Sequence, residues 1–520
     1  MFGRFAIGLP KFLREPIPPE QCPAILRSRL VHREQSFLSL IRKAVYENPS
    51  SPYLKLLRAA KIEYEAVSRL VNKDGIEATL GLLFDEGVYV TLEEFKGRHP
   101  IRRAGLEVEV KARYFDNPLL VSHFEGSTGA SRGGGTRLIV DLDLIAEDAL
   151  AHSLFLQSFR LESSPMAIWR PLPPGVAGIK KLFMQAKLGK SMERWFSQNQ
   201  HRLGLKNLKS FLFVSYALHA SRILGTGIPT PEFTPVDSAD RVAGWLARKA
   251  AQGSPGHLDT NATCGVRALL AAKETGLDIA GSFLRFGGEP YTITKAKLVD
   301  EAGCRAASHY SMSEVGTIGI ACADATELDD VHLISSKMAV LQRSRMATNP
   351  LHASDAFYLT TIAPICPKIM LNVACGDNGV IVDRECSCPL GQAGFNRHIH
   401  SIRSYEKLTS EGMHFLGSDL LRLLEHILPS QFGGGPTDYQ FVESEEAGLT
   451  KVRLLASPRL GPLDEKRLVE SVLEFLGSRA PENRMMVERW QEGQTLQVKR
   501  SEPHVTSAAK LLPLHVLPKE

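Results

Sequence analysis

Apolar residues recur with helical spacing near the start of the chain. In the stretch 35–46 they return at intervals near 3.6 residues, at Phe37, Leu38, Leu40, Ile41 and Val45. Residues spaced in this way share one face of a helix, and that face is available for burial. The pattern predicts a helical N-terminal segment of a large domain, with residues 1–110 as its bounds.

From about Arg137, short apolar runs alternate with helical patterns. Apolar residues between Val266 and Lys273 predict a helix. Strands are predicted from the apolar runs at 138–140, 211–214, 283–286, 317–321 and 369–373. Strands that alternate with helices are typical of an α/β fold. We therefore predict an α/β core of the large domain over residues 111–402.

The pattern changes again near residue 400. A strand is predicted at 451–456, and helices are predicted at 418–428 and 463–476, the first with Ser418 as its N-cap. This mixture predicts a small α+β C-terminal domain over residues 403–520. At roughly 150 residues per domain, the 520 residues of the chain allow more than one domain.

Composition and charge exclude several classes of protein. Hydrophobic residues make up 43% of the chain and charged residues 23%, which is typical of a globular protein and not of a disordered chain or a coiled coil. The net charge of +5 is too small over this length to predict a nucleic-acid partner. No apolar run approaches the roughly 18 residues of a membrane-spanning helix, so no span is expected.

Cysteine usage and the first residues indicate the compartment. The eight cysteines are mostly scattered, which suits reduced thiols better than a disulfide framework. Residues 1–10 lack the apolar core of a signal peptide. A cytoplasmic location is therefore expected.

The stretch 125–137 is unusually rich in glycine and hydroxyl side chains. It holds five glycines and four hydroxyl residues in thirteen positions. Such a loop can turn several N–H and O–H donors toward phosphate oxygens. No G-x-x-x-x-G-K-[ST] pattern is present, nor a G-x-G-x-x-G that opens a helix, which disfavours a P-loop kinase and a Rossmann dehydrogenase. A flexible surface loop is the alternative interpretation.

Further motifs follow this loop in a fixed order. They are Phe-Gly-Gly-Glu-Pro at 286–290, Tyr-Ser-Met-Ser-Glu-Val-Gly at 310–316, Cys-Gly-Asp at 375–377, Ile-Arg-Ser-Tyr-Glu-Lys at 402–407 and Thr-Ser-Ala-Ala-Lys at 506–510. The series resembles the adenylate-forming acyl and aryl ligases, in particular the phenylacetate-CoA ligase-like branch. The resemblance covers nearly the whole chain and lies in the order and spacing of the motifs. It implies an α/β fold with a large adenylate-forming domain of mixed sheets and helices and a small mobile α+β domain.

The resemblance implies a set of contacts to ATP and AMP. The β- and γ-phosphates would be held by Gly126, Ser127, Thr128 and Gly129. The backbone at Gly287, Gly288, Glu289 and Pro290 would lie against adenine, although a G-G-E-P sequence alone is more often a strand-to-helix turn. Tyr310 would stack on adenine, and Ser313 would hydrogen-bond a phosphate.

Two carboxylates are assigned by the same resemblance. Glu314 would ligate Mg²⁺, a hard cation that offsets the negative charge produced when a carboxylic acid attacks the α-phosphate. Asp377 would accept hydrogen bonds from both ribose hydroxyls, which its two oxygens suit. The sequence Asp-Asn-Gly at 377–379 also predicts a β-turn, and a turn can present a ligand.

Two basic residues belong to the predicted mobile domain. Arg403 and Glu406 match the Arg-x-x-Asp stretch at which the domain hinges in the family, although a charged connector is the commoner meaning of such a run. Lys510 would reach the α-phosphate and the carboxylate oxygen and stabilise the transition state as a catalytic residue. Lys499 is the alternative for this role.

A second constellation concerns metal binding. Cys386 and Cys388, together with Cys366, Cys375, His398 and His400, offer enough soft ligands for a structural zinc. The C-x-C spacing differs from the usual C-x₂₋₄-C, and buried free thiols are the alternative. His123 and His332 are further candidates to touch a substrate, but each is a lone histidine in sequence and neither is expected to act as a base.

These observations predict an ATP-dependent ligase. It would convert an aromatic or fatty acid to an acyl-adenylate, release pyrophosphate and transfer the acyl group to a thiol. The resemblance makes CoA the expected acceptor, with ATP and Mg²⁺ as cofactors. A carrier-protein thiol, a protein side chain or an amine are alternative acceptors. A homodimer is compatible with the sequence.

Two other classes stay open. The sequence departs from the family pattern at Arg132, Ser311, Glu406 and Ala509, and these departures are compatible with a non-catalytic descendant that binds a nucleotide or an acyl compound. An unrelated α/β nucleotide-binding protein would be indicated if residues 126–129, Glu314 and Asp377 did not converge in the structure.

Overall fold

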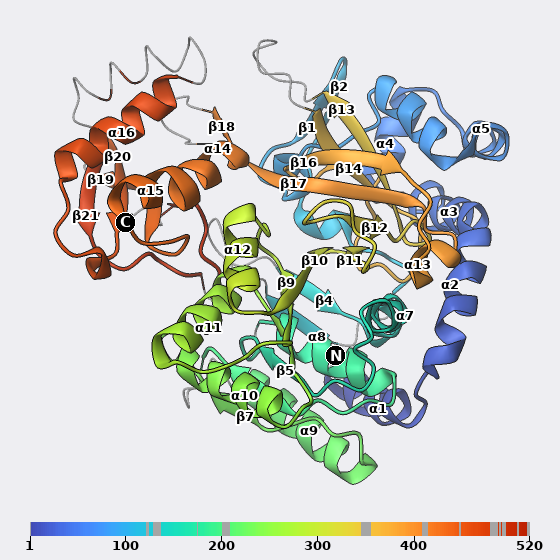
Figure 1. The fold of residues 1–520 in the computed structure, drawn as a ribbon. Helices are drawn as coiled ribbons and strands as arrows, with labels where there is room; N and C mark the ends of the chain where they lie inside the picture. Colours follow the sequence, from blue (N-terminus) through green and yellow to red (C-terminus); the bar gives the residue numbers. More distant parts are fainter. Residues whose placement is uncertain are drawn as a thin grey trace.

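The chain folds into a large N-terminal part and a smaller C-terminal part, which stands to one side in orange and red in Figure 1. The computed structural model describes residues 2–120, 124–127, 137–173, 175–199, 208–344, 355–407, 414–446, 449–478, 487, 490, 496–506 and 509–516.

The N-terminal segment is helical. Its helices are α1 (Phe2–Arg14), α2 (Cys22–Val31), α3 (Arg33–Ile41), α4 (Pro52–Ala59), α5 (Tyr64–Asp85) and α6 (Leu92–Phe95), followed by the hairpin β1 (Ile101–Arg103) and β2 (Leu106–Val108). The helix predicted at 35–46 is confirmed, as α3 followed by one π-helical turn, Arg42–Tyr46. Its periodic residues Phe37, Leu40 and Ile41 are buried, as the spacing requires.

A central eleven-stranded sheet forms the core of the large part. Its strands are β5 (Met166–Trp169), β6 (Arg194–Ser197), β7 (Pro231–Phe233), β8 (His257–Thr260), β9 (Phe283–Gly287), β10 (Arg305–Met312), β11 (Gly316–Ile320), β12 (Val331–Leu333), β16 (Asp377–Asp383), β17 (Arg397–Lys407) and β18 (His414–Leu416). The order is β16-β17-β12-β11-β10-β9-β8-β5-β6-β7, and β18 pairs with β17. Neighbours from β7 to β10 are parallel, and those from β10 to β16 are antiparallel.

Helices cover both faces of the parallel half of the sheet, as Figure 1 shows. Along β5, Ile168 joins the hydrophobic core under α7 (Leu142–Ser158), α8 (Ala177–Lys187) and α9 (Leu208–Leu224). Its neighbours Ala167 and Trp169 join the core under α10 (Ala239–Ala251), α11 (Ala262–Thr275) and α12 (Ile293–Glu301). Because successive side chains of a strand point to opposite faces, apolar runs without alternation signal a sheet buried on both sides.

Two smaller sheets complete the large part. One is formed by β13 (Met338–Ser344), β14 (Asp355–Thr361) and β15 (Val373–Ala374), and β13 contacts α5. The other is the hairpin β3 (Phe124–Ser127) and β4 (Arg137–Val140), whose strands flank the glycine-rich stretch. The strands predicted at 138–140, 283–286 and 317–321 are thus confirmed, as is the helix predicted between Val266 and Lys273, which lies in α11.

The C-terminal part has a sheet and a core of its own. Its sheet has the order β21-β20-β19-β22, formed by β19 (Tyr439–Glu446), β20 (Leu449–Ala456), β21 (Leu496–Arg500) and β22 (Leu514–Val516). Its helices are α14 (Gly417–Arg422), α15 (Leu428–Phe432) and α16 (Glu465–Gly477), with a π-helical turn Leu423–Ile427 between the first two. The predicted strand at 451–456 and helix at 463–476 are confirmed by β20 and α16. Their buried residues form one cluster with Trp490.

Two predicted strands are wrong. The run 211–214 lies in helix α9, where Phe213, Ala217 and Ala220 are buried at helical spacing. A short apolar run does not distinguish a strand from one turn of a buried helix, and the longer window decides. In the run 369–373, only Val373 belongs to a strand, the two-residue β15.

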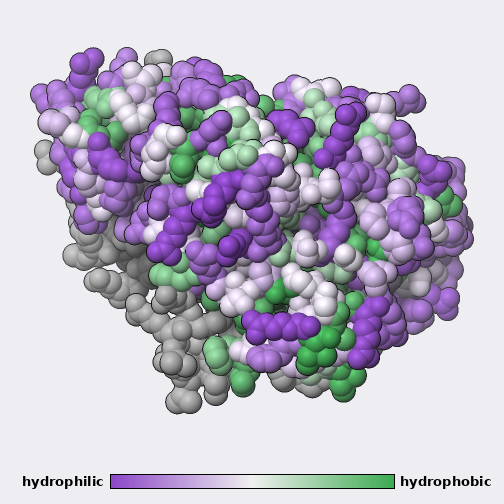
Figure 2. All heavy atoms as spheres, turned by 60° about the horizontal axis from the view of Figure 1, so that its bottom comes forward, coloured by the Kyte–Doolittle hydropathy of each residue, from purple (hydrophilic) through white to green (hydrophobic). Residues whose placement is uncertain are grey.

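Most of the surface seen in Figure 2 is hydrophilic, and hydrophobic residues form smaller patches, mainly along its lower edge. Large hydrophobic side chains that are exposed include Ile7 on α1 and Leu212 and Ile223 on α9. In the part of the chain that the structure describes, no helix is both long and apolar enough to cross a membrane.

Candidate active site

A cavity at the carboxyl ends of β9 and β10 brings together segments that are far apart in the sequence. Its walls are formed by Gly288, Glu289, Pro290, Tyr291, Ser308, His309, Tyr310, Ser311, Asp329, Asp377, Ile402 and Lys510. Backbone groups, hydroxyls, carboxylates and a lysine thus face one hollow, the mixture of a few polar groups that fixes a small ligand in place. Ligands of open α/β sheets bind at this edge because parallel strands present their carboxyl ends together.

Tyr310 and Asp377 form one wall of the cavity. The Tyr310 hydroxyl donates a hydrogen bond of 2.7 Å to Oδ2 of Asp377. Burial, and then the charge of Asp377, raise the pKa of Tyr310 well above its usual range, so the phenol stays protonated and remains a donor. Asp377 follows Gly376, whose φ of 82° lies in the left-handed region that glycine adopts without strain.

The β-turn predicted at 377–379 is wrong. These residues begin strand β16, where Asp377 pairs with Ser404 and Asn378 pairs with Arg403. The register shifts between Asn378 and Val380, so the Asn-Gly pair marks a bulge and not a hairpin turn. Asp377 is the first residue of the strand, and its side chain lines the cavity.

Glu289 joins the G-G-E-P segment to two other parts of the chain. Its carboxylate accepts hydrogen bonds from the N–H of Thr263 at 2.7 Å and from the Thr263 hydroxyl at 3.0 Å, at the start of α11. It also accepts one from the N–H of Leu511 at 2.7 Å. A carboxylate is favoured at a helix N-terminus, where N–H groups lack partners. Sequence reasoning assigned only the backbone of this segment and missed the link to Leu511.

Lys510 lies in a segment of the C-terminal part that is held against the large part. The Ala509 carbonyl accepts a hydrogen bond of 3.0 Å from the Asn261 side chain, and the Lys510 N–H donates one of 3.1 Å to the Thr506 hydroxyl. Ala509 has a φ of 54°, the left-handed conformation that a glycine would adopt without strain.

The side chain of Lys510 extends across the G-G-E-P segment. A Cβ added to Gly288, whose φ is 82°, would lie 2.5 Å from Lys510 Nζ. Desolvation lowers the pKa of Lys510, while the carboxylates of Glu289 and Asp377 oppose that shift. The alternative lysine, Lys499, is exposed on β21 and lines neither this cavity nor the next one described.

A second cavity adjoins the first. Gly288, His309, Ser311 and Lys510 line both. The remaining wall is formed by Ile145, Asp148, Arg170, Pro171, Val176, Ala177, Lys180, Lys181, Met184, Gly287, Met312, Ser313, Gly316 and Thr317. The wall therefore combines apolar side chains with charged ones, and Lys510 stands at the junction of the two cavities.

Most charges in the second cavity are paired. Arg170 and Lys181 contact Asp259 at 2.9 Å and 3.2 Å, and Lys337 contacts Asp148 at 2.5 Å. Lys180 has no ion-pair partner among the described residues. Burial lowers the pKa of Lys180, and the charges of Asp148 and Glu314 act in the opposite sense.

Glu314 is not among the residues that line either cavity, although its neighbour Ser313 lines the second one. It lies half-buried in the turn between β10 and β11. Its carboxylate offers hard oxygen ligands of the kind that Mg²⁺ takes together with phosphates and water. This donor fits the predicted ion.

The predicted phosphate loop is described only in part. Gly126 and Ser127 end strand β3, where their backbones pair with Leu138 and Arg137 of β4. Thr128, Gly129, Arg132 and His123 lie outside the described residues. The convergence of this loop with Asp377 therefore stays a prediction.

Arg403 does not line the first cavity but contacts Asp329, which does. Its guanidinium donates a hydrogen bond of 2.7 Å to Asp329, which also accepts the N–H groups of Ser401 and Ile402 at 2.8 Å and 3.0 Å. The stretch 403–407 belongs to strand β17 and continues to its pairing with β18, so it is not a loop connector. Asp329, which sequence reasoning missed, fixes this strand where Ile402 meets the cavity.

The comparisons with known proteins fit this description. No protein-family profile matches the chain, and no curated protein matches its sequence. Among solved structures, 2-hydroxyisobutyryl-CoA ligase in the postadenylation state in complex with R3-HIB-AMP is similar, with a TM-score of 0.52 and 14% identity over 98% of this chain and 91% of that chain. The same enzyme in complex with 2-HIB-AMP gives a TM-score of 0.50 and 15% identity over the same shares. The chain thus has the two-domain α/β fold of adenylate-forming enzymes.

Proposed function

We propose that the protein is an ATP-dependent, AMP-forming ligase of carboxylic acids, similar to the phenylacetate-CoA ligase-like branch. One observation carries the proposal. Residues from four motifs, Gly288–Pro290, Tyr310, Asp377 and Lys510, line one cavity in a chain with the fold of a CoA ligase. These motifs were selected from the sequence by their order, and the chemistry of adenylation needs them together.

The nucleotide would lie in the first cavity. The backbone of Gly288–Pro290 would face adenine, and the ring of Tyr310 would stack on it. Asp377, which accepts the Tyr310 hydroxyl, would receive the ribose hydroxyls on its carboxylate oxygens. The Tyr310–Asp377 bond holds both side chains in place before the ligand arrives, which reduces the entropy lost on binding.

The acid would lie in the second cavity, with its carboxylate at Lys510. One carboxylate oxygen would attack the α-phosphorus of ATP and form a new O–P bond. The bond between the α-phosphorus and the oxygen that bridges it to the β-phosphate would break, and pyrophosphate would leave. No base is needed because the carboxylate is already ionised at neutral pH. Lys510 would hold its positive charge against the α-phosphate as negative charge develops. Mg²⁺ held in part by Glu314 would supply charge neutralisation of the phosphates.

The acid would be aromatic or fatty, as the resemblance implies. The apolar residues Ile145, Val176 and Met184 provide a surface for either. Lys180 in the same wall, which has no ion-pair partner in the part of the chain that the structure describes, favours an acid that carries a hydrogen-bond acceptor beyond its carboxylate. This feature points to hydroxylated or oxo-substituted acids within those classes.

The acyl group would then pass to a thiol, with CoA as the expected acceptor. The C-terminal part is docked through Asn261–Ala509, Glu289–Leu511 and the ion pair Lys295–Glu425 at 2.7 Å. In this arrangement Lys510 occupies the junction where the adenylate forms. Rotation of the C-terminal part about β17 would break these contacts and open a path to the adenylate.

An exchange assay tests the proposal. The protein is incubated with ATP, Mg²⁺, labelled pyrophosphate and a panel of aryl, hydroxyaryl and fatty acids. The proposal expects acid-dependent return of label to ATP, with thioester formation when CoA is added. If label exchange occurs but no thioester forms with CoA, the acyl acceptor would instead be a carrier-protein thiol, a protein side chain or an amine. Absence of exchange with every acid, together with tight AMP binding, would instead support a non-catalytic descendant of the fold.

A further inference from the structure

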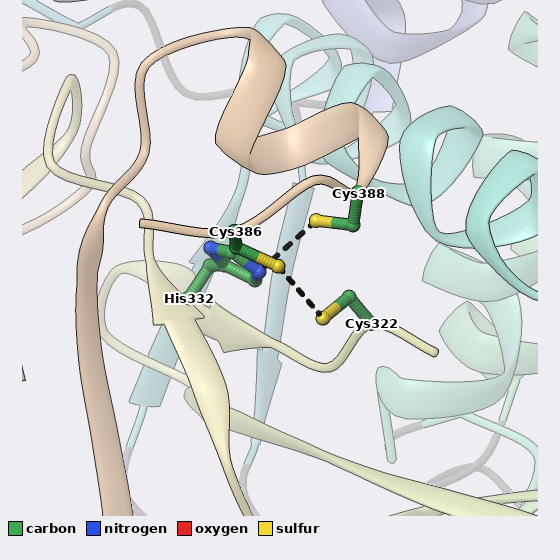
Figure 3. A group of neighbouring side chains, drawn as sticks. All are labelled: Cys322, His332, Cys386 and Cys388. Atoms are coloured by element: carbon green, nitrogen blue, oxygen red, sulfur yellow. Dashed lines mark hydrogen bonds between the residues drawn. The ribbon is translucent and has the colours of Figure 1, made fainter. Parts of the chain in front are cut away.

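Four side chains with soft ligand atoms converge away from the cavities described above. The ligand atoms of Cys322, His332, Cys386 and Cys388 all lie within 4.8 Å of one another. Figure 3 shows the four side chains gathered around one point. Cys322 follows β11, His332 belongs to β12, and the other two precede the short helix α13 (Pro389–Gln392). Three separate segments thus meet at one point.

The spacing of these atoms matches a tetrahedral metal site. With Zn–S bonds of about 2.3 Å, two sulfur ligands of a tetrahedron stand about 3.8 Å apart. The Sγ atoms of Cys322 and Cys386 are 3.7 Å apart, and Cys388 Sγ lies 3.2 Å from His332 Nε2. A disulfide would bring the two sulfurs to about 2.05 Å, which the 3.7 Å separation excludes.

The surroundings orient the ligands for a metal. His332 Nδ1 lies 2.6 Å from the Phe395 carbonyl, to which it donates, and this leaves the Nε2 lone pair directed at the sulfurs. The N–H of Gly391 donates to Cys388 Sγ at 3.3 Å, a contact that favours the thiolate. His332, Cys322 and Cys388 are buried, and Cys386 is half-buried.

We propose that Cys322, His332, Cys386 and Cys388 bind one structural Zn²⁺ ion. Three thiolates and one neutral imidazole fill a tetrahedron and leave no open position, so the ion would not take a substrate. Binding would release three thiol protons and leave the site with a charge of 2 − 3 = −1. The proposal is independent of the ligase function, because no residue of this cluster lines the active-site cavities.

The ligand set differs from the set expected from the sequence. Cys386 and Cys388 are members, but their partners are Cys322 and His332. The residues first expected lie elsewhere: His398 contacts Asp330 at 2.8 Å, His400 contacts Ser401, Cys375 contacts Tyr310, and Cys366 is buried in the core. Sequence spacing missed His332 because antiparallel pairing of β11 with β12 brings it back beside Cys322.

The ion would fasten the loop between β16 and β17 to β12 and to the segment that follows β11. Asp377 begins β16, and the loop after Asp383 carries Cys386 and Cys388 before the chain returns as β17. The same loop contacts the N-terminal helices, since Arg27 donates to the Gln392 carbonyl at 2.5 Å. A metal here would hold the far end of the hairpin that presents Asp377 and Arg403 at the active site.

Metal analysis of the full chain tests this proposal. The protein is expressed in zinc-supplemented medium, purified without a metal-affinity step, and analysed by plasma mass spectrometry. About one zinc per chain is expected. Cys388→Ser should lower the content at least severalfold, because it removes a ligand. Cys304→Ser is the matched control, since Cys304 is buried in another core and donates to the Ile279 carbonyl. Equal zinc in Cys388→Ser and the control, or less than about one tenth of an ion in the wild type, would overturn the proposal.

Cobalt substitution gives a second measurement on the wild-type chain, which does not depend on a variant that folds. Zinc is removed with a mercurial reagent and replaced by Co²⁺. The expected result is the intense d–d absorption of a tetrahedral ion together with thiolate-to-cobalt charge transfer, both lost when Zn²⁺ is added. The weak absorption of octahedral Co²⁺, or a Cys322–Cys386 disulfide found by mass mapping of the freshly purified protein, would contradict the assignment.

Discussion

The Tyr310 hydroxyl donates a hydrogen bond of 2.7 Å to the Asp377 carboxylate across 67 positions of sequence. The two residues lie on β10 and β16, which are not neighbours in the sheet. The bond therefore depends on the fold as a whole and not on local pairing. It links the two motifs that would hold the base and the sugar of a nucleotide.

Removal of this hydroxyl tests the link. Tyr310→Phe keeps the ring but removes the hydroxyl that donates to Asp377. The bond exists before AMP binds, so its loss removes only the ordering of the side chains, worth about 0.5–1.5 kcal/mol, and the affinity for AMP should fall roughly 2- to 13-fold. Calorimetric titration of AMP measures the change. An affinity equal to that of the wild type would show that the bond does not organise the nucleotide site.

The roles of Glu314 and Asp377 should separate by substitution. Glu314→Gln removes a metal ligand and should weaken Mg²⁺-dependent adenylation more than it weakens AMP binding, because AMP depends less on the ion than the reacting triphosphate does. Asp377→Ala should weaken both, since ribose is present in every state. AMP titration and pyrophosphate exchange on the two variants measure the difference. Equal losses of AMP affinity would contradict this division of roles.

The pKa of Lys510 predicts a pH dependence. Desolvation lowers this pKa from the ordinary lysine value of about 10.4. The protonated form would stabilise the transition state, so adenylation activity should be present below the lowered pKa and lost as pH rises through it. The measurement is a profile of kcat/KM against pH, which reports the free enzyme. The fall of kcat/KM at high pH, its alkaline limb, should have its midpoint below the ordinary lysine pKa.

Lys510→Arg is the control for this profile. Arginine stays charged over the accessible pH range, so the alkaline limb should move to higher pH even if the rate falls. An unchanged limb in the arginine variant would assign the titration to another group.

The ion pair Lys295–Glu425 should hold the C-terminal part in place for adenylation. The side chains are 5% and 7% exposed, and Glu425 also accepts a hydrogen bond from Thr292. Glu425→Leu leaves a buried lysine unpaired, at a cost of about 3–5 kcal/mol, and should slow pyrophosphate exchange more than tenfold.

Two further variants show whether the effect belongs to the pair. Lys295→Met combined with Glu425→Leu should recover most of the rate, because no unpaired charge is left buried. Glu301→Leu, which breaks the exposed pair Lys273–Glu301, should leave the rate nearly unchanged. A double variant as slow as Glu425→Leu would show that the charge pair is not the cause.

The sequence predicted the parts of the fold and site that local patterns encode. The helix at 35–46 and the strand at 283–286 follow from the pattern of apolar residues. Gly288, Tyr310 and Asp377 were found because the order of their motifs resembles that of the adenylate-forming ligases. The Glu289–Leu511 bond and the Cys322–His332 pair depend on which segments the topology brings together, and no spacing along the chain reveals that. The run at 211–214 was misread because four apolar residues fit either a strand or a buried helix.

The central claim is that Lys510 serves the formation of an acyl-adenylate, and one measurement addresses it directly. Pyrophosphate exchange is compared among the wild type, Lys510→Ala and Lys499→Ala, with the best acid of the panel. Removal of a charge-stabilising donor should lower the Lys510→Ala rate by about two to four decades. Lys499→Ala, which removes an exposed lysine of the same C-terminal part, should match the wild type, and transfer from supplied acyl-AMP to CoA should survive in both. Near-normal exchange in Lys510→Ala would contradict the account.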